Sequence, residues 1–335
     1  MKFYRSVVRP ILFSIDAEQV HHMAMSGLAA FGPLLARWAP AQDPRLARTF
    51  FGLTFPNPVG LAAGFDKNAV ALSAWAGLGF GFVEVGTITA RAQPGNPKPR
   101  IFRVPECEAI INRLGFNNEG ADAIAERLRR LRATERWPPI PVGINLGKSR
   151  VTPIDEAAAD YLLSFDRLQH YGDYFVLNVS SPNTPGLRAL QDHTALDELL
   201  GDVQRRNAAG APLLIKIAPD LEWEQIEDIL ALVEEHHVAG LIATNTTVDL
   251  TGVPEARRTQ GGLSGHPLRE RSTEIVRFIT ARSKVPVVAV GGILSPDDAL
   301  EKFDAGAALI QLYTGFIYEG PGLIRRICEA LLQRA

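Results

Sequence analysis

The chain has 335 residues, of which 46% are hydrophobic and 21% are charged, and its formal net charge is −2. This composition is that of an ordinary globular protein, so it excludes a disordered or collagen-like chain and gives no electrostatic reason to expect a nucleic-acid partner. The two cysteines, Cys107 and Cys328, form no CxxC pair, which disfavours a disulfide framework or structural zinc site and fits a reducing compartment.

The first 40 residues precede the first expected core strand and differ from the rest. Apolar residues recur every three or four positions from Phe3 to Ile15 and from Val20 to Phe31, which predicts two amphipathic helices. Pro10 either kinks the first helix or sets its start. Residues 1–40 hold four Lys or Arg and two Asp or Glu, so their net charge is four minus two, or +2. This pattern favours contact with an anionic membrane surface, with helices that only cap the next domain as the alternative.

Neither export nor membrane crossing is expected. The apolar stretch near the start is too short for a signal peptide, because Arg5 and Arg9 interrupt it. No apolar run reaches the 18 or so residues that a spanning helix needs.

Eight short apolar, β-branched runs follow, of the kind that forms strands buried on both faces. They are Val59–Ala63, Phe80–Thr87, Pro141–Leu146, Tyr174–Val179, Leu213–Ile217, Gly240–Thr244, Pro286–Val290 and Ala308–Tyr313. Helical patterns lie between them, such as Ala121–Leu131 and Trp223–His236. The order predicts a (β/α)8 TIM barrel, α/β in class, over residues 41–335 behind a helical extension at residues 1–40. Two unusually long connections, after Phe80–Thr87 and after Gly240–Thr244, indicate functional loops.

Polar residues stand at the carboxyl ends of these runs, where barrel enzymes place their chemistry. They are Gly64 and Lys67, Thr87, Asn145, Asn178 with Ser181, Lys216, Thr244 with Asn245 and Thr246, Gly291 with Gly292, and Tyr313 with Thr314. A barrel that needed only stability would have no reason to repeat this arrangement around one rim. The pattern predicts one ligand site there.

Each of these rim residues can also be explained without a ligand. Gly291 and Gly292 suit a phosphate site built from backbone N–H groups, but they are also ordinary turn residues. Lys216 interrupts the apolar run IKIAP, so its ammonium needs an anionic partner, which a flavin edge or a protein acid could supply. Ser181 lies in NVSSPNTPG, where two prolines stiffen a loop that either presents a base or is only a Ser-rich turn. No GxSxG or HExxH motif is present, so a hydrolase nucleophile and metal catalysis have no support.

These segments resemble the dihydroorotate dehydrogenase family, specifically its quinone-linked second class. The resemblance covers nearly the whole chain, and its motifs occur in the family's order. They are GLTFPNPVGLAAGFDKN, VEVGTITARAQPGNPKPRIFR, INRLGFNNEG, GINLGKS, LNVSSPNTPGLR, IKIAPD, IATNTT, GGLSG, VGGI and IQLYTGF. The resemblance implies oxidation of (S)-dihydroorotate to orotate in de novo pyrimidine (UMP) biosynthesis, with bound FMN and a quinone as electron acceptor.

Carried onto matching positions, the resemblance implies three sets of site residues. The FMN contacts are Ala63, Gly64, Phe65, Asp66, Lys67, Thr87, Asn145, Asn178, Lys216, Thr244, Gly265, Gly292, Tyr313 and Thr314. Dihydroorotate would meet Lys67, Asn112, Arg113, Leu114, Gly115, Phe116, Asn178, Asn183, Asn245 and Thr246. Ser181 would be the catalytic base that removes the C5 proton while hydride passes from C6 to flavin N5, assisted by Thr184 and a water, with Phe116 as a pocket wall.

The third set concerns the electron acceptor. The resemblance implies that the extension forms a quinone tunnel, with His21, Arg103 and Tyr313 near its inner end. The first-class enzymes have cysteine where Ser181 stands and lack the extension, and this chain differs from them in both. The expected location is therefore the cytoplasmic side of the cell membrane, as a peripheral protein that meets membrane quinone.

Two other functions remain to be weighed. A dihydrouridine synthase, another flavin barrel, acts on transfer RNA and should show a strongly basic face and an added RNA-binding domain, which the near-neutral charge does not favour. A barrel that only binds an anionic ligand would carry no flavin, so an absorbance spectrum separates that reading from an enzyme.

Overall fold

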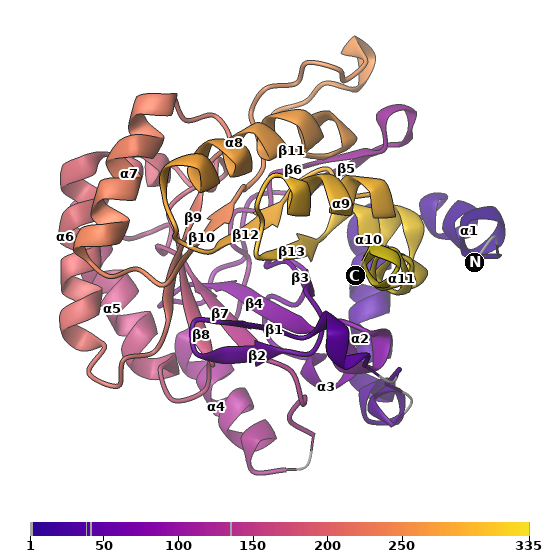
Figure 1. Ribbon diagram of the computed structural model, residues 1–335, viewed down its shortest axis with the longest axis horizontal. Coiled ribbons are helices and arrows are strands. Elements are labelled where there is room, and N and C mark those ends of the chain that lie inside the picture. Colours follow the sequence, from indigo (N-terminus) through magenta and orange to yellow (C-terminus); the bar gives the residue numbers. More distant parts are fainter. Residues whose placement is uncertain (1–2, 38, 41, 135, 335) are drawn as a thin grey trace.

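The structure is a computed structural model that describes residues 3–37, 39–40, 42–134 and 136–334. At its centre, eight parallel strands close a barrel in the order β10-β12-β13-β3-β4-β7-β8-β9 (Figure 1). Their bounds are Val59–Leu61 (β3), Phe82–Ile88 (β4), Val142–Leu146 (β7), Tyr174–Asn178 (β8), Leu213–Ile217 (β9), Gly240–Ala243 (β10), Val287–Val290 (β12) and Leu309–Leu312 (β13). Every residue of these strands is buried, which is why they read as continuous apolar runs.

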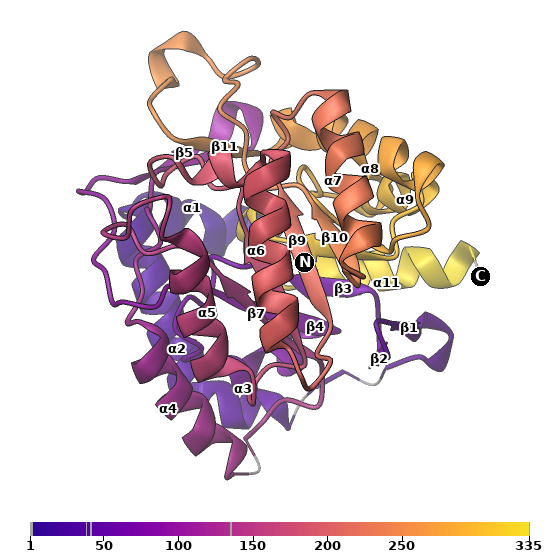
Figure 2. The same ribbon diagram turned by 90° about the vertical axis from the view of Figure 1, so that its left-hand side faces the viewer.

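Helices surround the barrel (Figures 1 and 2). They are α3 (Leu72–Trp75), α4 (Ala121–Arg132), α5 (Ala157–Leu168), α6 (His193–Arg206), α7 (Trp223–Glu235), α8 (Arg269–Arg282), α9 (Pro296–Asp304), α10 (Thr314–Glu319) and α11 (Gly322–Arg334). Short 3₁₀ turns lie at Pro44–Leu46, Ala76–Leu78, Pro105–Cys107, Leu187–Gln191, Glu255–Arg257 and His266–Leu268. Each barrel strand is followed by a helix, so the predicted (β/α)8 barrel is confirmed, and all eight predicted runs contain a strand.

A hairpin closes the amino end of the barrel. It consists of β1 (Arg48–Phe50) and β2 (Leu53–Phe55), which pair antiparallel. The side chain of Phe55 is fully buried, and its ring centroid lies 5.2 Å from that of Phe82 inside the barrel. The hairpin was not predicted. It leaves the carboxyl end as the open end of the barrel.

The two long connections meet over that open end. The one after β4 contains β5 (Ile101–Val104) and β6 (Ala109–Asn112), and the one after β10 contains β11 (Gly262–Gly265). These strands form a three-stranded antiparallel sheet in the order β11-β6-β5, with Asn112 paired to both Gly262 and Ile101. The sheet fixes both loops above the rim.

The extension consists of a π-helical turn η1 (Tyr4–Val8), α1 (Arg9–Phe13) and α2 (Ala17–Ala36), so both predicted helical stretches are helical. Pro10 is the second residue of α1, which continues directly from η1, so it lies within the helical stretch. The Asp16 carboxylate caps α2 by accepting hydrogen bonds from the backbone N–H groups of Glu18 and Gln19, each at 3.0 Å. Among the described residues, no helix is long and apolar enough to cross a membrane.

The extension is held against the barrel by side-chain contacts beside α10 and α11 (Figure 1). The Tyr4 hydroxyl donates to the Ile317 carbonyl at 2.7 Å. The Arg103 guanidinium, on β5, donates to the carbonyls of Leu12 at 3.1 Å and Ile15 at 2.8 Å. Arg103 thereby binds carbonyls at and just after the end of α1.

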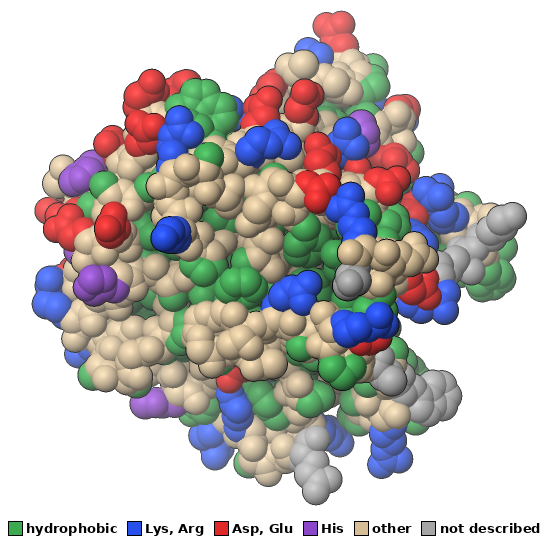
Figure 3. All heavy atoms as spheres, viewed as in Figure 1, with side chains coloured by type: hydrophobic (Ala, Val, Ile, Leu, Met, Phe, Trp, Pro, Cys, Tyr) green, Lys and Arg blue, Asp and Glu red, His purple; other side chains and the backbone are tan. Residues whose placement is uncertain are grey.

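Charges of both signs are interspersed over the face shown in Figure 3. Four arginines of α4 each lie beside an acid. Arg127 pairs with Glu119, Arg129 and Arg130 pair with Glu126, and Arg132 pairs with Asp173. These pairs fit a solvated helix face.

Candidate active site

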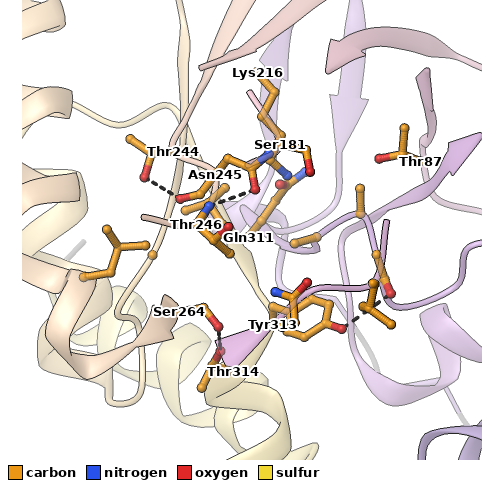
Figure 4. Close-up of a pocket in the computed structure, with 18 of the residues that line it drawn as sticks. Thr87, Ser181, Lys216, Thr244, Asn245, Thr246, Ser264, Gln311, Tyr313 and Thr314 are labelled. Atoms are coloured by element: carbon orange, nitrogen blue, oxygen red, sulfur yellow. Dashed lines mark hydrogen bonds between the residues drawn. The ribbon is translucent and has the colours of Figure 1, made fainter. Parts of the chain in front are cut away.

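A pocket opens at the carboxyl ends of the barrel strands, where barrel enzymes place their sites. Figure 4 shows side chains from several strands and loops converging on it. The predicted site residues that line it are Ala63, Gly64, Lys67, Thr87, Asn112, Leu114, Gly115, Phe116, Asn178, Ser181, Asn183, Lys216, Thr244, Asn245, Thr246, Gly265, Gly292, Tyr313 and Thr314. The structure therefore brings most of the predicted flavin and pyrimidine contacts into one cavity.

An amide network orders one side of the pocket. The Asn178 amide donates to Thr87 Oγ1 at 2.9 Å and to Asn145 Oδ1 at 3.2 Å. The Asn245 amide donates to Asn178 Oδ1 at 3.1 Å and to Ser180 Oγ at 3.0 Å. Because each amide is held by another strand end or loop, the network fixes which donors and acceptors face a ligand.

Ser181 lies on the loop after β8, with 7% of its surface exposed, and lines the pocket. Its Oγ accepts a hydrogen bond from the backbone N–H of Asn183 at 3.3 Å. Thr184, three residues further on, has a buried hydroxyl for which no hydrogen-bond partner is found in the described chain. A bound water could join such a hydroxyl to bulk solvent.

Lys67 is a buried cation at the pocket wall, and its ammonium donates to the Gly64 carbonyl at 2.7 Å. Burial, followed by the nearby charge of Arg100, lowers the pKa of Lys67 to about 8. Lys67 is therefore mostly charged at neutral pH, and it can bind a carboxylate there.

Sequence reasoning missed two polar residues, one in the lining of the pocket and one beneath it. Gln311, on β13, lines the pocket beside Lys216, and its amide donates to Glu84 Oε2 at 2.6 Å. Glu84, on β4, is fully buried, with its Oε1 3.7 Å from the ammonium of Lys216. Glu84 is thus a protein acid beside Lys216, one of the two anionic partners that the sequence allowed for this lysine. Lys216 also lines the pocket, where it can meet a ligand.

Four predicted contacts lie outside the lining of this pocket. The Asn145 side chain is fully buried beneath it, donating to Glu84 Oε1 at 2.7 Å. The Asp66 carboxylate is also fully buried, where it accepts from the backbone N–H groups of Val70 and Ala71.

Phe65 and Arg113 complete this group. Phe65 turns toward the extension, with its ring centroid 5.3 Å from that of His21. The Arg113 guanidinium donates to the Pro99 carbonyl at 2.9 Å and lines a separate surface depression. The side chains of Asn145 and Asp66 therefore position nearby residues of the same chain. The side chain of Arg113 points away from the pocket.

A second, apolar cavity of about 430 Å³ lies between the extension and the barrel. Its walls include Leu28, Phe31 and Leu35 from α2, together with the predicted quinone residues His21, Arg103 and Tyr313. Burial lowers the pKa of His21 to about 2, so its imidazole is neutral at physiological pH. Tyr313 and Asn112 line both cavities, so the two meet at these residues.

A closed barrel with a polar pocket at its carboxyl rim defines a β/α-barrel enzyme. A family model described as dihydroorotate dehydrogenase matches residues 45–334. A Gloeobacter violaceus protein named dihydroorotate dehydrogenase (quinone) is 54% identical, covering 100% of this chain and 95% of its own. A Synechococcus protein of the same name is 51% identical, covering 99% and 94%. The crystal structure of DHODH from Eimeria tenella in complex with ferulenol superposes with a TM-score of 0.84 at 38% identity, covering 95% and 91%. The chain belongs to the dihydroorotate dehydrogenase family.

Proposed function

We propose that this protein oxidises (S)-dihydroorotate to orotate through bound FMN and passes the electrons to a membrane quinone, as a step of de novo pyrimidine synthesis. The observation that carries the proposal is the pair of adjoining cavities, one polar and one apolar, with Tyr313 and Asn112 in the walls of both. One site must hold a small polar anion and the other a hydrophobic acceptor, and both must reach the same cofactor. The names of the relatives support both substrates.

The residues of the polar pocket fit FMN. Gly265, Gly291, Gly292 and Gly315 line one side, which lets backbone approach a phosphate without an intervening side chain. Ser264 and Thr314 add hydroxyls on that side, 2.8 Å apart (Figure 4). Bound there, FMN would accept a hydride from dihydroorotate and later deliver two electrons to the quinone.

The chain's own residues divide the remaining work. Lys67 would hold the substrate carboxylate, and Asn112, Asn183 and Asn245 would pair with its carbonyl and N–H groups, since asparagine both donates and accepts. Ser181 Oγ would take the C5 proton, and the hydroxyl of Thr184 would help a water carry it outward. Lys216 would stabilise negative charge at the pocket floor.

The extension would supply the acceptor's path and the contact with the membrane. Of the eleven large hydrophobic side chains exposed in the described chain, six lie between Phe3 and Leu34. Together with the net charge of +2 over residues 1–40, they support peripheral attachment to an anionic leaflet, which we place on the cytoplasmic side. Vesicle co-sedimentation tests this attachment.

We expect the protein to purify yellow with one noncovalent FMN, because the pocket offers both a phosphate cradle and a cation for the ring. Lys216→Met should weaken FMN binding or slow flavin reduction, since developing negative charge loses its nearest cation. Absorbance after denaturation measures FMN content, and stopped-flow measures reduction. A colourless protein that cannot be reconstituted contradicts the proposal, and wild-type behaviour of Lys216→Met removes that role from Lys216.

We expect orotate binding to weaken as pH rises through about 8. Burial lowers the pKa of Lys67 to about 8, so above that pH the free enzyme loses the positive charge that would hold the ligand carboxylate. Titrating the FMN spectrum with orotate between about pH 6 and 10 gives the dissociation constants, with tenfold weakening per pH unit as the upper limit for one proton. Lys67→Met should bind weakly at every pH. The same pH dependence in Lys67→Met would contradict the assignment.

A further inference from the structure

The pocket floor rests on a carboxylate that has no exposure to solvent. Glu84, on β4, is 0% exposed and accepts hydrogen bonds from Asn145 on β7 and Gln311 on β13, while its Oε1 lies 3.7 Å from the ammonium of Lys216 on β9. β4, β9 and β13 are not neighbours in the barrel sheet, so their side chains meet only inside the barrel. Lys216 and Gln311 line the pocket and Glu84 does not, which places Glu84 one layer beneath them.

Hydrogen-bond donors surround the carboxylate of Glu84. Both of its oxygens accept from amide N–H groups, and its third polar neighbour is an ammonium, which only donates. A buried negative charge is tolerated only when it is paired and hydrogen-bonded, and Lys216 supplies the pairing charge. The hydrogen bonds of Asn145 and Gln311 orient the carboxylate toward the centre of the barrel.

Resting on the proposed function, we propose that Glu84 is a positioning residue that acts through Lys216. Its carboxylate holds the ammonium of Lys216 at the floor and offsets its charge, and so sets how strongly the site favours the reduced, more negative flavin. Without Glu84, the charge of Lys216 would have only the flavin to balance it. The ion pair would therefore tune the reduction potential of bound FMN downward from the value that an unpaired lysine would give.

The direct test is a redox titration of the FMN-loaded full chain at pH 7. Glu84→Gln keeps the size of the side chain and one of its two acceptor oxygens, and it removes the charge. We expect the midpoint potential to rise by at least about 30 mV, which for two electrons is a tenfold gain in the affinity for reduced over oxidised flavin. Glu84→Asp keeps the charge and should shift the potential by less than half as much.

The partnership with Lys216 is tested in a second background. In Lys216→Met, the cation through which Glu84 is proposed to act is gone, so the further change Glu84→Gln should alter the potential little. We expect the shift caused by Glu84→Gln in that background to be less than half of the shift in the wild type. Glu319→Gln is the matched control, because Glu319 is 4% exposed and lies on α10, outside the lining of the pocket.

An unchanged or lowered potential in Glu84→Gln overturns the inference, as does an equal shift in both backgrounds or an Asp variant that behaves like Gln. If Glu84→Gln fails to hold FMN, Glu84→Asp is used in its place. The dissociation constants of its apoprotein for oxidised and for reduced FMN are measured, and their ratio is compared with that of the wild type. A ratio shifted as far as the ratio in Lys216→Met contradicts the role of Glu84. A wild-type protein that binds no FMN would sink the proposed function itself. If the wild-type protein binds FMN and Glu84→Gln has the same midpoint potential as the wild type, only this inference fails and the proposed function stands.

Discussion

Replacing Ser181 by alanine is expected to slow flavin reduction by dihydroorotate about 10²- to 10⁴-fold, the usual contribution of a positioned base. Ser181 lines the pocket with 7% exposure, and its Oγ is fixed by the backbone N–H of Asn183. The alanine variant loses only this oxygen, so it should still bind FMN and orotate. Stopped-flow absorbance at saturating dihydroorotate measures the rate.

Two companions sharpen this test. Ser181→Cys should keep part of the activity, because a thiolate can also accept the proton. Ser164→Ala is the control for loss of a buried serine hydroxyl: Ser164 is fully buried on α5, its Oγ donates to the Asp160 carbonyl at 3.2 Å, and it does not line the pocket. A normal rate in Ser181→Ala would move the base to another residue.

Filling the apolar cavity is expected to stop quinone turnover while leaving dihydroorotate oxidation intact. Gly27 lines this cavity from α2, and a Cβ added there would meet no atom within 4 Å. Gly27→Trp should therefore fold, since tryptophan favours a helix more than glycine does, and its ring would occupy the quinone path. We expect quinone reoxidation of the reduced flavin to fall at least about tenfold, an energy of about 1.4 kcal/mol.

The control is a tryptophan on the same helix that points elsewhere. Ala30 is exposed on α2 and lies outside the cavity lining, so Ala30→Trp should reoxidise normally. Deleting residues 1–40 should abolish both quinone reoxidation and vesicle binding while dihydroorotate still bleaches the flavin, provided that melting shows an intact barrel. If the Gly27→Trp and truncated proteins both reoxidise with long-chain quinone like the full chain, the extension is only a cap.

The barrel strands could be predicted because their signal is local. Strands such as β9 and β12 are buried on both faces, so each appears as a short apolar run between turn residues. The β5-β6-β11 sheet could not be found in this way, because Asn112 and Gly262 are 150 residues apart and their pairing depends on the closed barrel. The β1-β2 hairpin had an overlooked signal, the turn at Phe51 and Gly52, where both residues have positive φ.

The same contrast between local signals and long-range contacts holds for the site residues. Lys216 stood out as a charge within an apolar strand, and the same criterion applied to FVEVGT and LIQLYT would have found Glu84 and Gln311. What no single segment shows is that these three residues meet inside the barrel, because that requires the strand order. Motif matching placed Asp66 and Arg113 in the site with their neighbours, but the hydrogen bonds of their side chains direct both elsewhere.

We propose that one bound FMN passes electrons from dihydroorotate to quinone. An anaerobic titration tests it most directly: dihydroorotate is added to the purified protein, followed by quinone, NAD or fumarate in parallel, with flavin absorbance and orotate recorded throughout. We expect one equivalent of dihydroorotate to bleach the flavin and to yield one equivalent of orotate, and we expect only quinone to restore the yellow colour rapidly. A flavin that dihydroorotate does not bleach, or that NAD or fumarate reoxidises as fast as quinone, would contradict it.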